Sequence, residues 1–83
     1  MDNDEIRKRI LVKMYDLERE LAGNVVASTK LSKELNIPDE DVGFNIRFLA
    51  EEGYITADPL HSKTYSAMVG ITPKGIITVE NNF

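Results

Sequence analysis

The most constraining feature of the sequence is a change in the spacing of its apolar residues at Gly53. Before Gly53, apolar residues recur three or four positions apart, which is the spacing of one helix face. After it come short runs rich in β-branched and aromatic residues, bounded by turn residues, which is typical of strands. The expected elements are a helix over 3–22, a short strand over 24–27, helices over 28–35 and 39–52, strands over 54–57 and 64–71, and a last helix from Thr72. This order predicts one α+β domain over 1–83, in which three helices are followed by a β-hairpin.

Residues that start and stop helices stand at the expected boundaries. Asp2 and Glu5 have the spacing of a capping box, and Ser28 and Thr72 are favourable N-caps. Pro38 cannot continue a helix but can begin one, so it separates the second helix from the third. The apolar faces of these elements are expected to share one core: Leu11, Met14, Leu31, Leu35, Val42, Ile46, Leu49, Ile55, Ile71 and Ile76.

The composition argues against several classes of functional site. A chain of 83 residues forms one domain at most and buries a modest core, roughly 60 % of its unfolded surface. It contains no cysteine, which rules out disulfides, thiolate zinc sites and cysteine nucleophiles. No glycine-rich phosphate loop, nucleophile elbow or metalloprotease motif is present, and His61 has no second ligand at metal-binding spacing. We therefore expect no enzyme activity, no metal and no cofactor. Since no signal peptide or membrane-length apolar run is visible, we expect a cytoplasmic protein.

The middle of the chain resembles a known family pattern. From Leu31 to Ile55 the sequence reads LSKELNIPDEDVGFNIRFLAEEGYI, and from Ile71 to Gly75 it reads ITPKG. The spacing of the aliphatic residues, the glycine before the hairpin and the T-P-K-G segment after it are similar to the MarR-like and ArsR-like winged-helix regulators. The resemblance covers about residues 25 to 77 and implies a winged helix-turn-helix fold. It further implies a DNA-binding transcription regulator that acts as a homodimer, so that two copies contact two half-sites.

The resemblance also implies where DNA would be contacted. Helix 39–52 would be the recognition helix, with its N-terminal residues at base edges in the major groove. The second helix would lie across the DNA backbone, and the wing 54–71 would touch phosphates or the minor groove. The candidate DNA-binding residues are Lys30, Lys33, Gly43, Phe44, Arg47, His61 and Lys63. Each lysine taken alone is also compatible with an ordinary solvated surface charge.

The charge of helix 39–52 leaves a second function open. The helix carries five acids and one base, Arg47, and the net charge of the whole chain is −4. DNA-binding domains are usually basic, because much of their affinity comes from neutralising phosphates. Asp39, Glu40 and Asp41 have a structural explanation, since acids in a first helical turn interact favourably with the helix dipole. The alternative is a winged-helix protein-interaction module, whose acidic third helix binds a protein partner and does not bind DNA.

Two phenylalanines of the same helix also have two interpretations. Phe44 and Phe48 lie four residues apart, and this spacing predicts that they pack in the core or beneath the wing. If they are exposed instead, they form an apolar patch suited to a protein partner or to a second copy of the chain.

Overall fold

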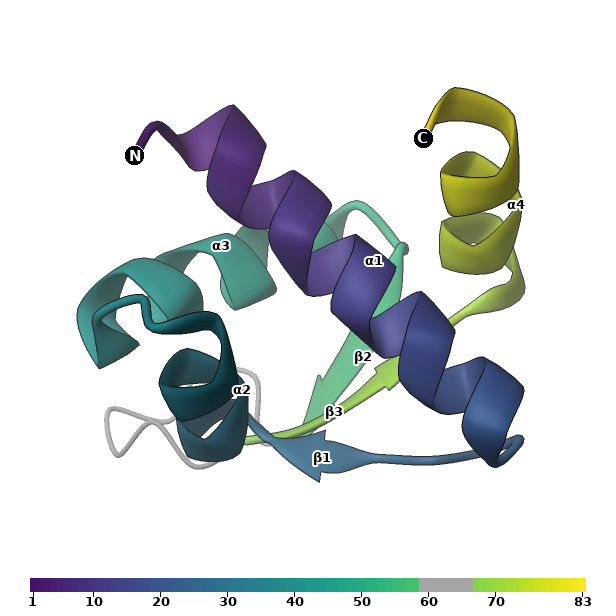
Figure 1. The fold of residues 1–83 in the computed structure, drawn as a ribbon, viewed down its shortest axis with the longest axis horizontal. Helices are drawn as coiled ribbons and strands as arrows, with labels where there is room; N and C mark the ends of the chain where they lie inside the picture. Colours follow the sequence, from purple (N-terminus) through teal and green to yellow (C-terminus); the bar gives the residue numbers. More distant parts are fainter. Residues whose placement is uncertain (59–66) are drawn as a thin grey trace.

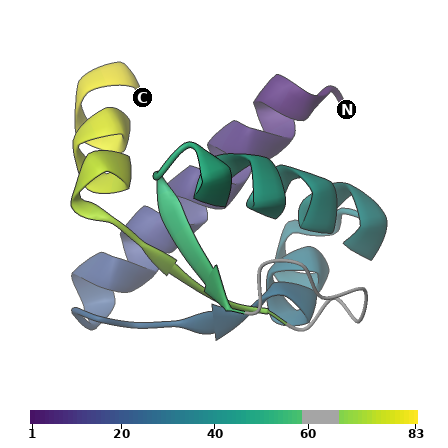
Figure 2. The same cartoon turned by 180° about the vertical axis from the view of Figure 1, so that it is seen from behind.

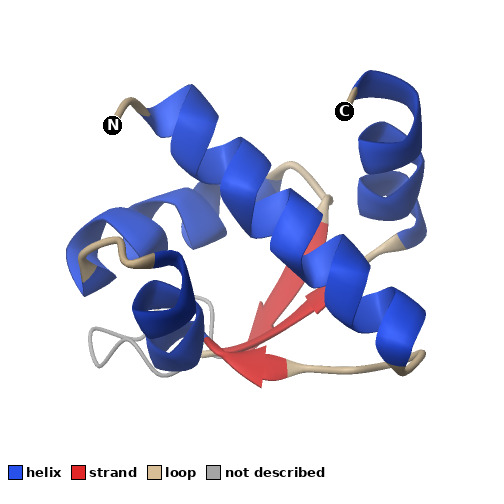
Figure 3. Ribbon diagram, viewed as in Figure 1, coloured by secondary structure: helices blue, strands red, loops and turns tan. Residues whose placement is uncertain are grey.

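The helices and strands follow one another in the expected order. The computed structural model describes residues 1–58 and 67–83. Its elements are α1 (Asn3–Glu20), β1 (Val26–Ala27), α2 (Ser28–Leu35), α3 (Asp39–Glu51), β2 (Ile55–Asp58), β3 (Met68–Ile71) and α4 (Pro73–Asn82). Figures 1 and 3 show the helices gathered around one small sheet. The predicted α+β class is therefore confirmed, and the arrangement is that of a winged helix, with the β2–β3 hairpin following α3.

The described strands form one antiparallel sheet in the order β1-β3-β2. Val26 of β1 pairs with Val69 of β3, and Ile55 of β2 pairs with Ile71 on the other side of β3. The predicted hairpin is confirmed where β2 and β3 pair, and the short strand predicted before the second helix is confirmed as β1. The sheet lies behind α1 in Figure 1 and in front of it in Figure 2, so α1 covers one face of the sheet.

The first helix begins as its sequence predicts but ends earlier. The Asp2 Oδ1 atom accepts a hydrogen bond of 2.8 Å from the backbone N–H of Glu5, which is the expected capping contact. The helix ends at Glu20, and the chain then turns at Gly23 with a φ of 79°, which favours glycine. Leu21, the last apolar residue at helical spacing, is therefore exposed rather than packed.

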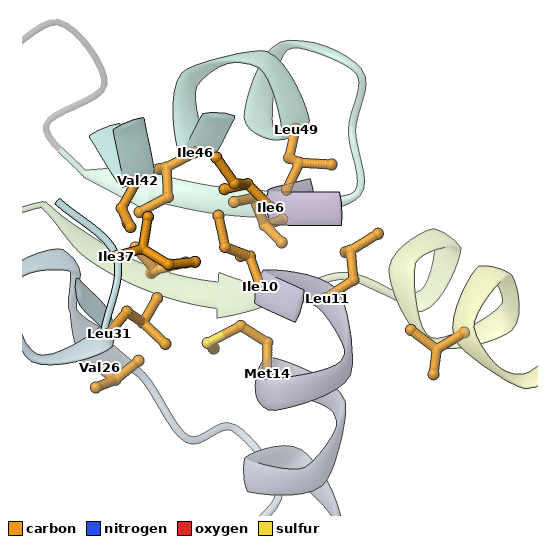
Figure 4. Close-up of a cluster of buried hydrophobic side chains, with 13 residues drawn as sticks. Ile6, Ile10, Leu11, Met14, Val26, Leu31, Ile37, Val42, Ile46 and Leu49 are labelled. Atoms are coloured by element: carbon orange, nitrogen blue, oxygen red, sulfur yellow. The ribbon is translucent and has the colours of Figure 1, made fainter. Parts of the chain in front are cut away.

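One hydrophobic core lies between α1, α2, α3 and the sheet (Figure 4). Most of the expected core residues are buried: Leu11, Met14, Leu31, Val42, Ile46, Leu49 and Ile55. Leu35 and Ile71 are half-buried and pack against this core. The expectation for Ile76 is wrong, because it is half-buried outside the core cluster, and Val79 is the buried aliphatic residue of α4 instead. The core also includes residues that the expected set omitted: Ile6, Ile10, Val26, Ile37 and Val69.

The start of α2 differs from the expectation in one respect. Ser28 is the first residue of the helix rather than its N-cap, because β1 runs directly into α2 and Ala27 occupies the cap position. Ser28 is buried, and its backbone N–H donates to the carbonyl oxygen of Ala67 at 2.9 Å. The first turn of α2 is thereby joined to the residue that precedes β3, which ties the helix to the sheet.

Candidate nucleic-acid interface

A tight turn joins α2 to α3. Asn36 adopts the left-handed helical conformation, with φ 56° and ψ 45°, which asparagine tolerates better than most residues. The backbone N–H of Ile37 donates to the carbonyl oxygen of Ser32 at 3.1 Å, and the Ile37 side chain is buried in the core. Pro38 then stands at the N-cap of α3. The turn is anchored at both ends, so α2 and α3 form the predicted helix-turn-helix pair (Figure 2).

The third helix has one buried face and one exposed face. Its buried residues are Val42, Asn45, Ile46 and Leu49. Its exposed residues are Asp39, Glu40, Asp41, Phe44, Arg47, Phe48 and Glu51. Gly43, a candidate contact, is half-buried. The exposed set, which we call the outer face of α3, is the surface that would meet DNA if α3 were a recognition helix.

The cations of the candidate interface differ in their surroundings. The Arg47 Nε atom donates to Glu51 Oε1 at 2.9 Å, so its charge is paired within α3. Lys30 and Lys33 lie exposed on α2, and neither forms an ion pair with another residue in the described part of the chain. These two lysines are therefore the candidates on the described helices whose charge is available to an external anion.

The two phenylalanines of α3 are exposed, so the packing predicted for them is wrong. Phe44 is 60 % exposed and Phe48 is 40 % exposed. The physical reason is helical phase. At 100° per residue, Phe44 lies about 200° around the helix axis from the buried Val42, on the opposite side.

Two more candidate residues, His61 and Lys63, lie outside the residues that the structure describes.

A buried polar network ties α3 to α1. Asn45 is fully buried, and its Oδ1 atom accepts a hydrogen bond of 2.9 Å from Arg7 Nε. Its Nδ2 atom donates to Asn3 Oδ1 at 3.0 Å and to the carbonyl oxygen of Asp41 at 2.9 Å. A buried amide is costly unless its groups are hydrogen-bonded, and here both ends of the amide are bonded. The network fixes how α3 sits against α1, and hence where the outer face points.

Sequence reasoning did not single out Asn45. A helical asparagine is usually assigned to a polar surface. The available signal was its position, three residues after Val42 and four before Leu49, which places it on the apolar face. A polar residue in that position indicates a buried hydrogen-bond network.

The T-P-K-G segment closes the end of α3. The Thr72 hydroxyl donates to the carbonyl oxygen of Gly53 at 2.6 Å and accepts from the backbone N–H of Gly75 at 3.1 Å. The Lys74 Nζ atom donates to the carbonyl oxygen of Glu52 at 2.8 Å. Carbonyl groups at a helix end lack partners within the helix, and here side chains from the start of α4 supply them. This segment therefore joins α4 to the end of α3, and the Lys74 ammonium is engaged within the fold.

Two further properties concern metal binding and membrane insertion, in the part of the chain that the structure describes. No group of three histidine, aspartate or glutamate side chains there is placed to hold a metal ion. None of the described helices combines the length and apolar character needed to cross a lipid bilayer. Comparison with protein-family models, curated proteins and solved structures gives no match to this chain.

Proposed function

We propose that this chain binds double-stranded DNA as a winged-helix transcription regulator, with α3 in the major groove and α2 across the phosphate backbone. One observation carries the proposal: α2 and α3 form a helix-turn-helix pair that is followed directly by the β2–β3 hairpin. Helix pairs joined by a short turn are common, but the addition of a hairpin is characteristic of the winged-helix proteins that the sequence resembles.

The charges near α3 determine how such binding would work. Lys30 and Lys33 are exposed and available to phosphates, which would position α2 on the DNA backbone. Asp39, Glu40 and Asp41 are exposed in the first turn of α3, where base edges would be contacted. Within a Debye length of about 8 Å, their repulsion of phosphates is incompletely screened at physiological salt. We therefore expect binding that depends strongly on salt and is opposed by these acids.

Neutralising Glu40 is expected to strengthen binding of a random-sequence duplex. Glu40→Gln removes one negative charge near the phosphates and should tighten binding about twofold. Lys33→Ala should weaken binding to every sequence and lower the slope of log affinity against log salt by about one unit. Fluorescence anisotropy titrations with labelled duplexes over a series of salt concentrations measure both quantities.

The control for this experiment is Glu20→Gln, which makes the same change of charge at an exposed position at the end of α1. It should leave the affinity unchanged. If the parent chain does not bind a duplex even at roughly 50 mM salt, where phosphate contacts are strong, the DNA proposal fails. The protein-interaction module then becomes the better account of the fold.

We also propose that the regulator is a homodimer, since two-fold symmetry would let two copies contact two half-sites. An open groove of about 610 Å³ between α1, α3 and α4 is the candidate surface for the second copy. Leu11, Phe48, Tyr54 and Phe83 line it, beside the charged residues Asp2, Asp4, Glu5, Arg7 and Lys8. Sedimentation equilibrium at micromolar protein is expected to show a species heavier than the 9.4 kDa chain. A single 9.4 kDa species over that range would count against the dimer.

A further inference from the structure

The ring of Phe48, on α3, already has a guanidinium group stacked over it. The guanidinium carbon of Arg7 lies 3.6 Å from the centre of the Phe48 ring. The Arg7 Nη1 atom lies 3.6 Å from Asp4 Oδ1, so a carboxylate stands beside the stacked cation. A planar guanidinium is well suited to this arrangement, because it can stack on a ring face while its N–H groups point to a carboxylate.

The other phenylalanine offers the same groups without the cation. Phe44 lies one turn before Phe48 on the outer face of α3 and is the more exposed of the two. Glu40 and Asp41 precede it by four and three positions, so their carboxylates are its neighbours on the helix surface. Among residues 1–58 and 67–83, no cation lies over the Phe44 ring, and neither acid forms an ion pair.

The nearest cation on α3 does not fill this position. Arg47 follows Phe44 by three residues, but its Nε atom is bonded to Glu51, one turn further along the helix. The space over Phe44 is therefore bordered by an exposed aromatic ring and by two carboxylates with no cation partner on the described chain. A cation supplied from outside these described residues would complete the arrangement.

We propose that the outer face of α3 around Phe44 docks an arginine-bearing protein segment, one guanidinium of which stacks on Phe44 and pairs with Glu40 or Asp41. The acids attract a cationic segment and repel a polyanion, and the ring favours arginine over lysine. The docking itself does not depend on the proposed DNA binding. Its consequence does rest on that function: a segment seated on the outer face would exclude DNA from α3.

The test uses the full chain and two short synthetic peptides, one of alternating glycine and arginine and one of alternating glycine and lysine. NMR titration of the isotope-labelled chain with each peptide, at about 50 mM salt, gives both affinity and location. We expect the arginine peptide to bind more tightly than the lysine peptide, with the largest shifts at Glu40, Asp41 and Phe44. Phe44→Ala should weaken the arginine peptide about 2- to 30-fold, the range of a cation–π contact.

Three further variants separate stacking from general attraction. Phe44→Leu keeps an apolar side chain but removes the ring, and it should lose the preference for arginine over lysine. The double variant E40Q/D41N removes two negative charges at the site and should weaken both peptides. The matched control D16N/E20Q removes two charges from exposed positions of α1 and should change neither affinity.

Several results would overturn the docking proposal. Equal binding of the two peptides, or parent-like binding by Phe44→Ala, would reduce the interaction to general charge attraction. Shifts spread evenly over all acidic residues would have the same meaning. A duplex DNA that shifts Phe44 and Glu40 when the arginine peptide does not would also refute docking while supporting the DNA proposal. Peptide binding at this site without any DNA binding would support the docking proposal and refute the DNA proposal.

Discussion

Gly75→Ala is expected to lower the free energy of unfolding by about 3 kcal/mol. A Cβ atom at this position would lie 2.8 Å from Ile71 Cγ1 and would meet the carbonyl oxygen of Tyr54 at a still shorter distance. The oxygen belongs to the backbone, so relief of the overlap requires α4 to move away from the segment between α3 and β2. In an open helix the same substitution would stabilise the protein by about 1 kcal/mol, so even the sign is diagnostic.

Urea denaturation of both proteins measures the expected loss through the midpoint and the slope of the transition. Gly23→Ala is the comparison variant, in which the added Cβ meets no heavy atom within 4 Å but the backbone has a φ of 79°. That variant isolates the cost of a left-handed backbone, about 1–2 kcal/mol, without any close contact. If Gly75→Ala proved as stable as the parent, the close approach of α4 to Tyr54 would not be a constraint on the fold.

Leu49→Ala is expected to destabilise the protein by about 2–5 kcal/mol, the usual cost of a cavity at a buried leucine. Leu49 is 2 % exposed and belongs to the core that α3 shares with α1 (Figure 4). Its deletion removes packing atoms in a region where the Asn45 network limits how far the two helices can close together.

The control for Leu49→Ala lies on the same helix. Phe44→Ala removes a larger side chain from a position that is 60 % exposed, and it should change the free energy of unfolding by no more than about 0.5 kcal/mol. Thermal or chemical unfolding of both variants tests the orientation of α3 directly. Equal losses at the two positions would mean that α3 is rotated about its axis, so that Phe44 is buried as well as Leu49.

The order of elements was predictable because period and capping act locally. The aliphatic spacing at Val42, Ile46 and Leu49 identified the buried face of α3, and the change of period at Gly53 identified the hairpin. The buried face of the last helix was harder to predict. Its apolar residues Ile76, Ile77 and Val79 lie too close together for their spacing to define one face, which is why Ile76 was expected in the core where Val79 is found.

The candidate site was only partly predictable, because its properties depend on contacts between helices. The exposed Lys30 and Lys33 could be located from the sequence. The stacking of Arg7 on Phe48 depends on how α1 crosses α3, and no local sequence pattern predicts that crossing. The pairing of Arg47 with Glu51 was readable from its four-residue spacing, and it lowers the charge that the outer face of α3 can offer to phosphates.

Arg7 of α1 contacts two residues of α3, so the free energies of these two contacts are coupled. Its guanidinium covers Phe48, and its Nε atom is the donor to the buried Oδ1 of Asn45. Any external acid that drew Arg7 away would leave that buried oxygen without this donor, at a cost of about 1–3 kcal/mol. By reciprocity, whatever steadies Asn45 also holds Arg7 back from external acids. The N-terminal half of α1 thus offers a half-buried arginine whose affinity for an outside ligand is set by the interior of the protein.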